Sequence, residues 1–161
     1  SWSGRLSDWL GINVPVKPIR GQVLASRLVP SPIKHILWHG INWMVPKADG
    51  SVIMGTTRED AGFDDLPNLG GVSGILNECI KLVPEMSNAH LHKVWGGLRP
   101  ATPDEAPIIG PVKHFDGLLL ALGHYRSGIL LSAVTGKLVM DFIVSGTDIQ
   151  IKDFNVDRFN S

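Results

Sequence analysis

Residues 118–131 have the sequence LLLALGHYRSGILL, and their pattern predicts the main elements of the C-terminal part of the chain. The apolar run Leu118–Leu122 has the length of one buried strand. Gly123 follows it, and from about Ser127 to Ser145 apolar residues recur on more than one face of a helix. The stretch therefore predicts a strand, a glycine-containing turn and a long apolar helix in direct succession.

The chain upstream of this stretch is rich in predicted strands. Lys47–Gly50 contains the Asp-Gly pair that is typical of a hairpin turn. A short helix is predicted from Ser3 to Gly11, and a longer one at Gly74–Val83, where apolar residues have helical spacing up to Pro84. The predicted strands are Ile19–Val29, Ile33–Gly40, Ile41–Pro46, Ser51–Thr57 and His90–Leu98, followed by a proline-rich loop to Gly110.

The composition excludes several classes of protein. The 161 residues include 15 Lys+Arg and 15 Asp+Glu, so the chain lacks the basic surplus that a nucleic-acid binder needs. The 18 glycines and 11 prolines are too many for a helical bundle and have no collagen-like period. The one cysteine, Cys79, allows no disulfide within the chain and predicts a small buried hydrophobic residue.

No membrane-spanning segment is predicted. The run Gly117–Gly123 is too short, and Lys137 and Asp141 interrupt Gly128–Gly146. The chain opens without a methionine and without a cleavable signal. We therefore expect it to start inside a longer protein, located in the cytoplasm.

Common catalytic and metal-binding motifs are absent from the sequence. It contains no G-x-G-x-x-G, no P-loop and no G-x-S-x-G. His90-x-His92 has no third ligand nearby in the sequence and predicts a solvated strand face. The acidic stretch Glu59–Asp65 lacks the spacing of a calcium loop and predicts a solvated loop. No metal site is expected.

Two arginines lie beside glycines at the ends of predicted elements. Arg99 follows Gly96-Gly97-Leu98, where the glycines allow a flat ligand to approach the backbone and the guanidinium can grip a carboxylate. Arg126 precedes the long helix, whose first N–H groups favour an anion or a developing negative charge. Each arginine is also compatible with an ordinary surface charge, so composition leaves both interpretations open.

Two segments carry a family resemblance. Residues 95–110, WGGLRPATPDEAPIIG, together with 118–131 resemble the C-terminal part of the D-amino-acid-oxidase-type FAD-dependent oxidoreductases. They are most similar to the glycine oxidases linked to thiamine biosynthesis. The motifs W-x-G-L-R-P and G-H-[FY]-R-x-G-I-L-L are specific for this family. Segments 2–4, 18–22, 45–47 and 55–59 agree in the same order, so the resemblance covers nearly the whole chain.

The resemblance implies that the chain is the C-terminal portion of such an enzyme, because it lacks the family's Gly-rich βαβ unit that binds the ADP part of FAD. The implied fold class is α+β, with a mixed, mainly antiparallel substrate-binding sheet, flanking helices and a C-terminal strand–helix piece of a Rossmann-like FAD-binding domain. Residues 1–11 would be a remnant helix of the FAD domain, 12–103 the substrate-binding domain, and 104–161 the segment that returns to the FAD domain. FAD is expected in the full-length protein and not in this chain.

The resemblance also implies a site. Arg99 would clamp the substrate carboxylate and Arg126 would border the same pocket. Trp43 stands where glycine oxidases usually have a tyrosine that helps to bind the carboxylate. An indole donates but cannot accept a hydrogen bond, and Trp43 is equally compatible with a packed aromatic residue. The residues expected to meet the flavin are Gly97, His124, Tyr125, Arg126, Ser127, Gly128, Ile129 and Leu130. No side-chain base is required or predicted.

The implied reaction is the oxidation of a small amino acid or amine to an imine by hydride transfer to the flavin. The alternatives are a D-amino-acid dehydrogenase, a sarcosine-oxidase-like enzyme, or an inactive fragment that only binds carboxylates or self-associates. The residues leave open whether oxygen or another acceptor takes the electrons. We expect a homo-oligomer, because the apolar helix and a strand edge would be left uncovered.

Overall fold

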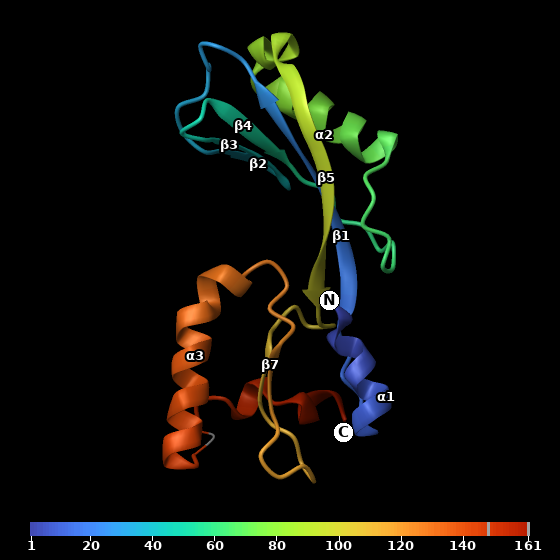
Figure 1. The fold of residues 1–161 in the computed structure, drawn as a ribbon, viewed down its shortest axis with the longest axis vertical. Helices are drawn as coiled ribbons and strands as arrows, with labels where there is room; N and C mark the ends of the chain where they lie inside the picture. Colours follow the sequence, from blue (N-terminus) through green and yellow to red (C-terminus); the bar gives the residue numbers. More distant parts are fainter. Residues whose placement is uncertain (148, 161) are drawn as a thin grey trace. The chain divides into compact units, whose positions relative to one another are not determined.

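The computed structural model describes residues 1–147 and 149–160 (Figure 1). Asp148 and Ser161, both inside the predicted segment 104–161, lie outside the described residues. The chain forms two compact units. The sheet unit is Ile19–Leu98, and the terminal unit combines Ser1–Pro18 with the residues from Arg99 onward. The assignment of residues 1–11 and 104–161 to a flavin domain stays a prediction.

The sheet unit contains five strands in the order β2-β3-β4-β1-β5. The strands are β1 (Lys17–Arg27), β2 (Leu37–His39), β3 (Asn42–Pro46), β4 (Ser51–Gly55) and β5 (His90–Ala101), of which β1 and β5 continue into the terminal unit. The pairs β2–β3, β3–β4 and β1–β4 are antiparallel. The mainly antiparallel α+β class is confirmed.

The turn between β3 and β4 has the predicted hairpin chemistry. Asp49 Oδ1 accepts hydrogen bonds from the Ser51 N–H at 2.9 Å and from the Ser51 hydroxyl at 2.7 Å. Gly50 has a φ of 82°, a conformation that glycine adopts without steric cost. The predicted strand Ile33–Gly40 is wrong over its first half, because only Leu37–His39 pairs with β3.

Helix α2 (Leu69–Leu82) packs on one face of the sheet. It starts one turn before the predicted Gly74, because Asn68 caps it by accepting a hydrogen bond from the Gly71 N–H at 2.8 Å. The 3₁₀ helix η2 (Pro84–Asn88) follows its end. The buried core comprises Leu24, Ile33, Met44, Val52, Met54, Ile75, Cys79 and Met86.

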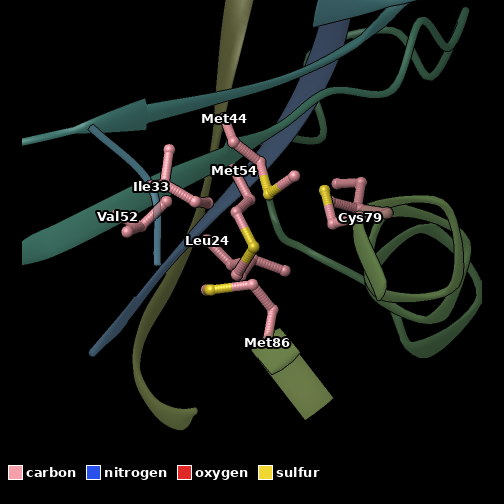
Figure 2. Packing of buried hydrophobic residues seen from close by; sticks show 8 residues of the cluster. Leu24, Ile33, Met44, Val52, Met54, Cys79 and Met86 are labelled. Carbon is pink, nitrogen blue, oxygen red and sulfur yellow. The ribbon is translucent and has the colours of Figure 1, made fainter. Parts of the chain in front are cut away.

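Figure 2 shows the sulfur-rich part of this core, with Met44 and Met54 of the sheet between Cys79 of α2 and Met86. Cys79 is 2% exposed, and burial raises the pKa of its thiol to about 11. A thiol with that pKa stays protonated at neutral pH. The prediction that Cys79 is a small buried hydrophobic residue is therefore confirmed.

The terminal unit is built on a two-stranded antiparallel sheet, β6 (Ile108–Pro111) and β7 (Leu119–Leu122), followed by helix α3 (Gly128–Ser145). The predicted strand–turn–helix succession is confirmed. The loop predicted to run to Gly110 is wrong from Ile108 onward, because Ile108 and Ile109 are buried and pair with Leu122 and Ala121. The N-terminal elements are the 3₁₀ helix η1 (Trp2–Arg5) and helix α1 (Leu6–Leu10).

The C-terminal segment holds this unit together through side chains that the sequence analysis did not single out. It contains the 3₁₀ helices η3 (Lys152–Phe154) and η4 (Val156–Phe159). Asn160 Oδ1 accepts from the Asn13 N–H at 2.8 Å, and Asn160 Nδ2 donates to the Asn13 carbonyl at 3.0 Å. Arg158 Nε donates to Asp104 Oδ2 at 2.8 Å, and its second terminal nitrogen donates to the Ala106 carbonyl at 2.9 Å. These bonds tie the C-terminal segment to Asn13 and to the loop that precedes β6.

Helix α3 is apolar on most of its surface. By length and composition it could cross a membrane, since its 18 residues have a mean hydropathy of 1.6. Lys137 and Asp141, the two charges from which we predicted no membrane-spanning segment, pair with each other at 2.6 Å. Within the described part of the chain only Thr135 of this helix is buried. Ile129, Leu130, Ile143 and Val144 are all more than 60% exposed.

Candidate functional site

The turn Gly123–Ser127, between β7 and α3, is held in place by the backbone before it. Tyr125 has a φ of 48° and is 8% exposed, and its N–H donates to the Pro100 carbonyl at 2.9 Å. Gly123 has a φ of 73°, and a Cβ there would lie 2.8 Å from Thr102 Cγ2. The fold of this unit therefore requires a glycine at position 123.

His124 attaches the same turn to the helix that follows. Its Nε2 lies 2.9 Å from the hydroxyl of Thr135, which is one of five buried polar or charged residues in the part of the chain that the structure describes. Burial lowers the pKa of His124, so the imidazole is neutral at neutral pH. Thr135 was not among the predicted site residues, although an uncharged polar residue inside an apolar helix is a signal for such a role.

The N-terminus of α3 is open. Ser127 precedes the helix without capping it by a side-chain hydrogen bond. The first N–H groups of a helix have no partner within the helix and carry partial positive charge. A Cβ at Gly128 would meet only His124 Cβ, at 3.5 Å, an ordinary contact. The chain's own packing therefore does not require a glycine at 128, and the space beside it is available to a ligand.

The two predicted arginines belong to the terminal unit. Arg99 is half-buried and immediately precedes Pro100, whose carbonyl holds Tyr125, so Arg99 is attached to the turn that starts α3. Arg126 lies within that turn with its side chain 62% exposed. Its guanidinium lies 5.2 Å from the centre of the Tyr125 ring and is 4.0 Å from Glu105 Oε2, a loose ion pair. Both arginines and the residues 124–130 thus belong to one unit.

Two predicted site residues, Trp43 and Gly97, belong to the sheet unit. Met44 points into the core beside α2, so Trp43, the preceding residue of β3, lies on the opposite face of the sheet. Among the described residues none accepts a hydrogen bond from the Trp43 indole N–H. A Cβ at Gly97 would have no atom within 4 Å, whereas one at Gly96 would lie 2.1 Å from the Asp65 carbonyl oxygen. Of the twin glycines, the sheet unit requires only Gly96.

The acidic stretch Glu59–Asp65 is solvent-exposed at Asp60, Asp64 and Asp65, as predicted for a solvated loop, but Glu59 is half-buried in a network of ion pairs and hydrogen bonds that we did not predict. Arg20, 6% exposed, donates to Glu59 Oε2 through Nε at 2.8 Å and to Asp64 Oδ2 through Nη1 at 2.6 Å. Burial alone would raise the pKa of Glu59, but hydrogen bonds from Thr57, Arg20 and Gln22 lower it overall. This network fixes the loop to β1, and the sequence analysis did not find it, because its partners are far apart in the chain.

Residues 1–142 match the family described as FAD dependent oxidoreductase, of the DAO type. The chain belongs to this family. The match spans both units, so the resemblance carried by residues 95–110 and 118–131 is confirmed for nearly the whole chain.

Among individual members of this DAO family, the chain is 39% identical over 140 residues to the hydrogen cyanide synthase subunit HcnC of Pseudomonas protegens, covering 86% of the chain and 34% of that protein. It is 32% identical over 159 residues to the glycine oxidase of Bacillus subtilis, covering 98% and 43%. The crystal structure of glycine oxidase from Geobacillus kaustophilus superposes with a TM-score of 0.89 at 33% identity, covering 98% and 43%. The chain thus spans less than half the length of these relatives.

Proposed function

We propose that the complete protein is an FAD-dependent oxidoreductase that oxidises a small amino acid or amine to an imine. The observation that carries the proposal is the open N-terminus of α3, joined to Arg99 through the hydrogen bond from Tyr125 to the Pro100 carbonyl. It supplies a place for developing negative charge and a cation for a carboxylate within one unit. FAD, when bound, accepts a hydride from the substrate α-carbon.

The N–H groups at the start of α3 would stabilise the negative charge that reduction brings to the flavin ring. Ile129 and Leu130, 95% and 82% exposed, provide apolar surface at the same helix end. The neutral imidazole of His124 keeps the turn against Thr135 without adding charge. The residues proposed to meet the cofactor are Gly97, His124, Tyr125, Arg126, Ser127, Gly128, Ile129 and Leu130.

The substrate side of the site would consist of Arg99, Arg126 and Trp43. A guanidinium binds a carboxylate through two parallel hydrogen bonds, and Arg99 is the better placed of the two, because it is half-buried. The Trp43 indole would donate one further hydrogen bond to the carboxylate. The nitrogen proton of the substrate leaves to water. Water then hydrolyses the imine to a carbonyl compound and ammonia, or to a carbonyl compound and an amine where the substrate nitrogen carries a substituent.

The chain contains no Gly-rich βαβ turn that could hold the FAD pyrophosphate, so cofactor binding would depend on a further part of the protein. We propose that the isolated chain is colourless and inactive and forms dimers or larger assemblies through α3. For the complete protein we propose a cytoplasmic homo-oligomer.

A second candidate is the production of hydrogen cyanide. It is favoured by identities of 39% and 37% to two proteins named hydrogen cyanide synthase subunit HcnC, the second covering 99% of the chain. From glycine this product requires a second two-electron oxidation of the imine with loss of carbon dioxide. The same residues would serve the first oxidation in both candidates.

The test is to mix the complete protein with glycine, sarcosine, D-alanine or D-proline without oxygen and to follow the visible flavin absorbance. Bleaching by a small amino acid or amine supports the proposal, and bleaching by none of them contradicts it. Recovery of the colour on admitting air distinguishes an oxidase from a dehydrogenase. Cyanide and glyoxylate assays on the glycine reaction then separate the two candidates.

A further inference from the structure

Gly55 ends strand β4 and lies between two larger residues across the sheet. It pairs with Trp43 of β3 on one side and with Val23 of β1 on the other. Both neighbours project from the face opposite α2, because Met44 and Leu24, next to them in sequence, belong to the core on the α2 side.

The Trp43 indole occupies the space that a side chain at position 55 would need. A Cβ at Gly55 would lie 2.9 Å from Trp43 Cζ2, 3.3 Å from Trp43 Cε2 and 2.7 Å from Val23 Cγ1. Cε2 is bonded to the indole nitrogen, so the edge of the ring that carries the N–H lies over Gly55. The φ of Gly55 is not in the left-handed region. Close packing against Val23 and Trp43 therefore opposes any side chain at this position.

We propose that Gly55 is a positioning residue for substrate binding, because it determines where the Trp43 indole N–H lies on the open face of the sheet. This inference rests on the proposed function, in which that N–H donates to the substrate carboxylate. Val23 borders the same position from β1, its Cγ1 being 2.7 Å from the place that a Cβ at position 55 would take. Gly55 itself touches neither substrate nor cofactor.

An added methyl group at position 55 would push the ring outward and misplace the N–H. One hydrogen bond to a charged group is then lost, which corresponds to about a tenfold rise in KM. The hydride step does not use this bond, so kcat stays within about twofold.

The experiment uses four complete flavoproteins in a Val23→Ala background, which removes the methyl group that a new Cβ would otherwise meet first. The first of the four carries no further change, the second carries Gly55→Ala, the third carries Trp43→Phe, and the fourth carries both substitutions. Phenylalanine lacks the Cζ2 atom that contacts position 55. We expect Gly55→Ala to raise the KM for the best amino acid substrate about tenfold when Trp43 is present and less than about twofold when Trp43→Phe is also present. Trp38 lies on the same face, but its indole N–H donates a hydrogen bond to the Gly40 carbonyl. The control Trp38→Phe should therefore change KM less than about twofold.

The inference would be overturned if Gly55→Ala changed KM equally with Trp43 and with Trp43→Phe, or if it changed KM in neither case. Gly55→Ala alone could abolish the flavin content. In that case, flavin content that returns when Trp43→Phe is added supports the inference, and flavin content that stays absent overturns it. If the parent protein oxidises no amino acid, the proposed function fails independently of Gly55. Near-ultraviolet circular dichroism then tests the packing alone: a change on Gly55→Ala that depends on Trp43 supports it, and an unchanged spectrum overturns it.

Discussion

Gly128 allows the proposed cofactor contact to be separated from the stability of the chain. It is the first residue of α3, and a Cβ there meets only His124 Cβ at 3.5 Å. Alanine is more favourable than glycine within a helix by up to about 1 kcal/mol. Because Gly128 is the first residue of the helix, Gly128→Ala should stabilise the protein by less than about 1 kcal/mol, which corresponds to less than about 4 °C in Tm for a chain of this size.

The same substitution should weaken FAD binding, because the new methyl group occupies the space through which the flavin ring would approach the N–H groups. We expect the Kd for FAD to rise at least about tenfold, a loss of roughly 1.4 kcal/mol, and Gly128→Val to lose the flavin or shift its spectrum. Tm is measured on the apoprotein by calorimetry, and the Kd by titration with FAD.

Two other glycines provide matched controls. Gly136, further along α3, also has open space at its Cβ position, so Gly136→Ala should raise Tm and leave the Kd unchanged. Gly123→Ala should lower Tm, because the φ of 73° and the Thr102 methyl group oppose a side chain. An unchanged Kd together with full activity in Gly128→Ala would refute the placement of the flavin at this helix end.

Other predictions concern the arginines, the acid stability and the isolated chain. Arg99→Ala should raise KM steeply, because the substrate complex loses roughly 2–4 kcal/mol of stability. Near-normal kinetics in this variant would remove Arg99 from the site. Arg158→Ala should lower the free energy of unfolding by about 2 kcal/mol in urea titrations, because Asp104 and the Ala106 carbonyl lose a charged donor. The hydrogen bond from Arg158 lowers the pKa of Asp104 from 3.8 to about 2. The ionised Asp104 therefore contributes stability that is present above pH 3.8 and is lost as the pH falls toward 2. Asp104→Asn should flatten this part of the curve of stability against pH. The isolated 161-residue chain should have no flavin absorbance and should scatter light as a dimer or larger, and a yellow monomer would contradict this.

Features that depend on neighbouring residues could be predicted from the sequence. The strand Leu119–Leu122, the turn and the helix Gly128–Ser145 follow from apolar runs and a glycine signal within one short stretch. The Asp-Gly turn before Ser51 and the family motifs around Arg99 and Arg126 are equally local. Such patterns are readable because backbone preferences and turn chemistry act over a few residues.

Contacts between groups that are far apart in the chain became known from the folded structure alone. Arg20 and Glu59 are 39 residues apart, and Asn13 and Asn160 are 147 apart, so no local pattern pairs them. Ile108–Pro111 became a strand because β7 offered a partner, although prolines on either side predicted a loop. The roles of the glycines depend on the same cause. The sequence does not distinguish the adjacent glycines Gly96 and Gly97. The Asp65 carbonyl lies beside Gly96, so the fold requires glycine at 96, whereas the space at Gly97 is open to a ligand.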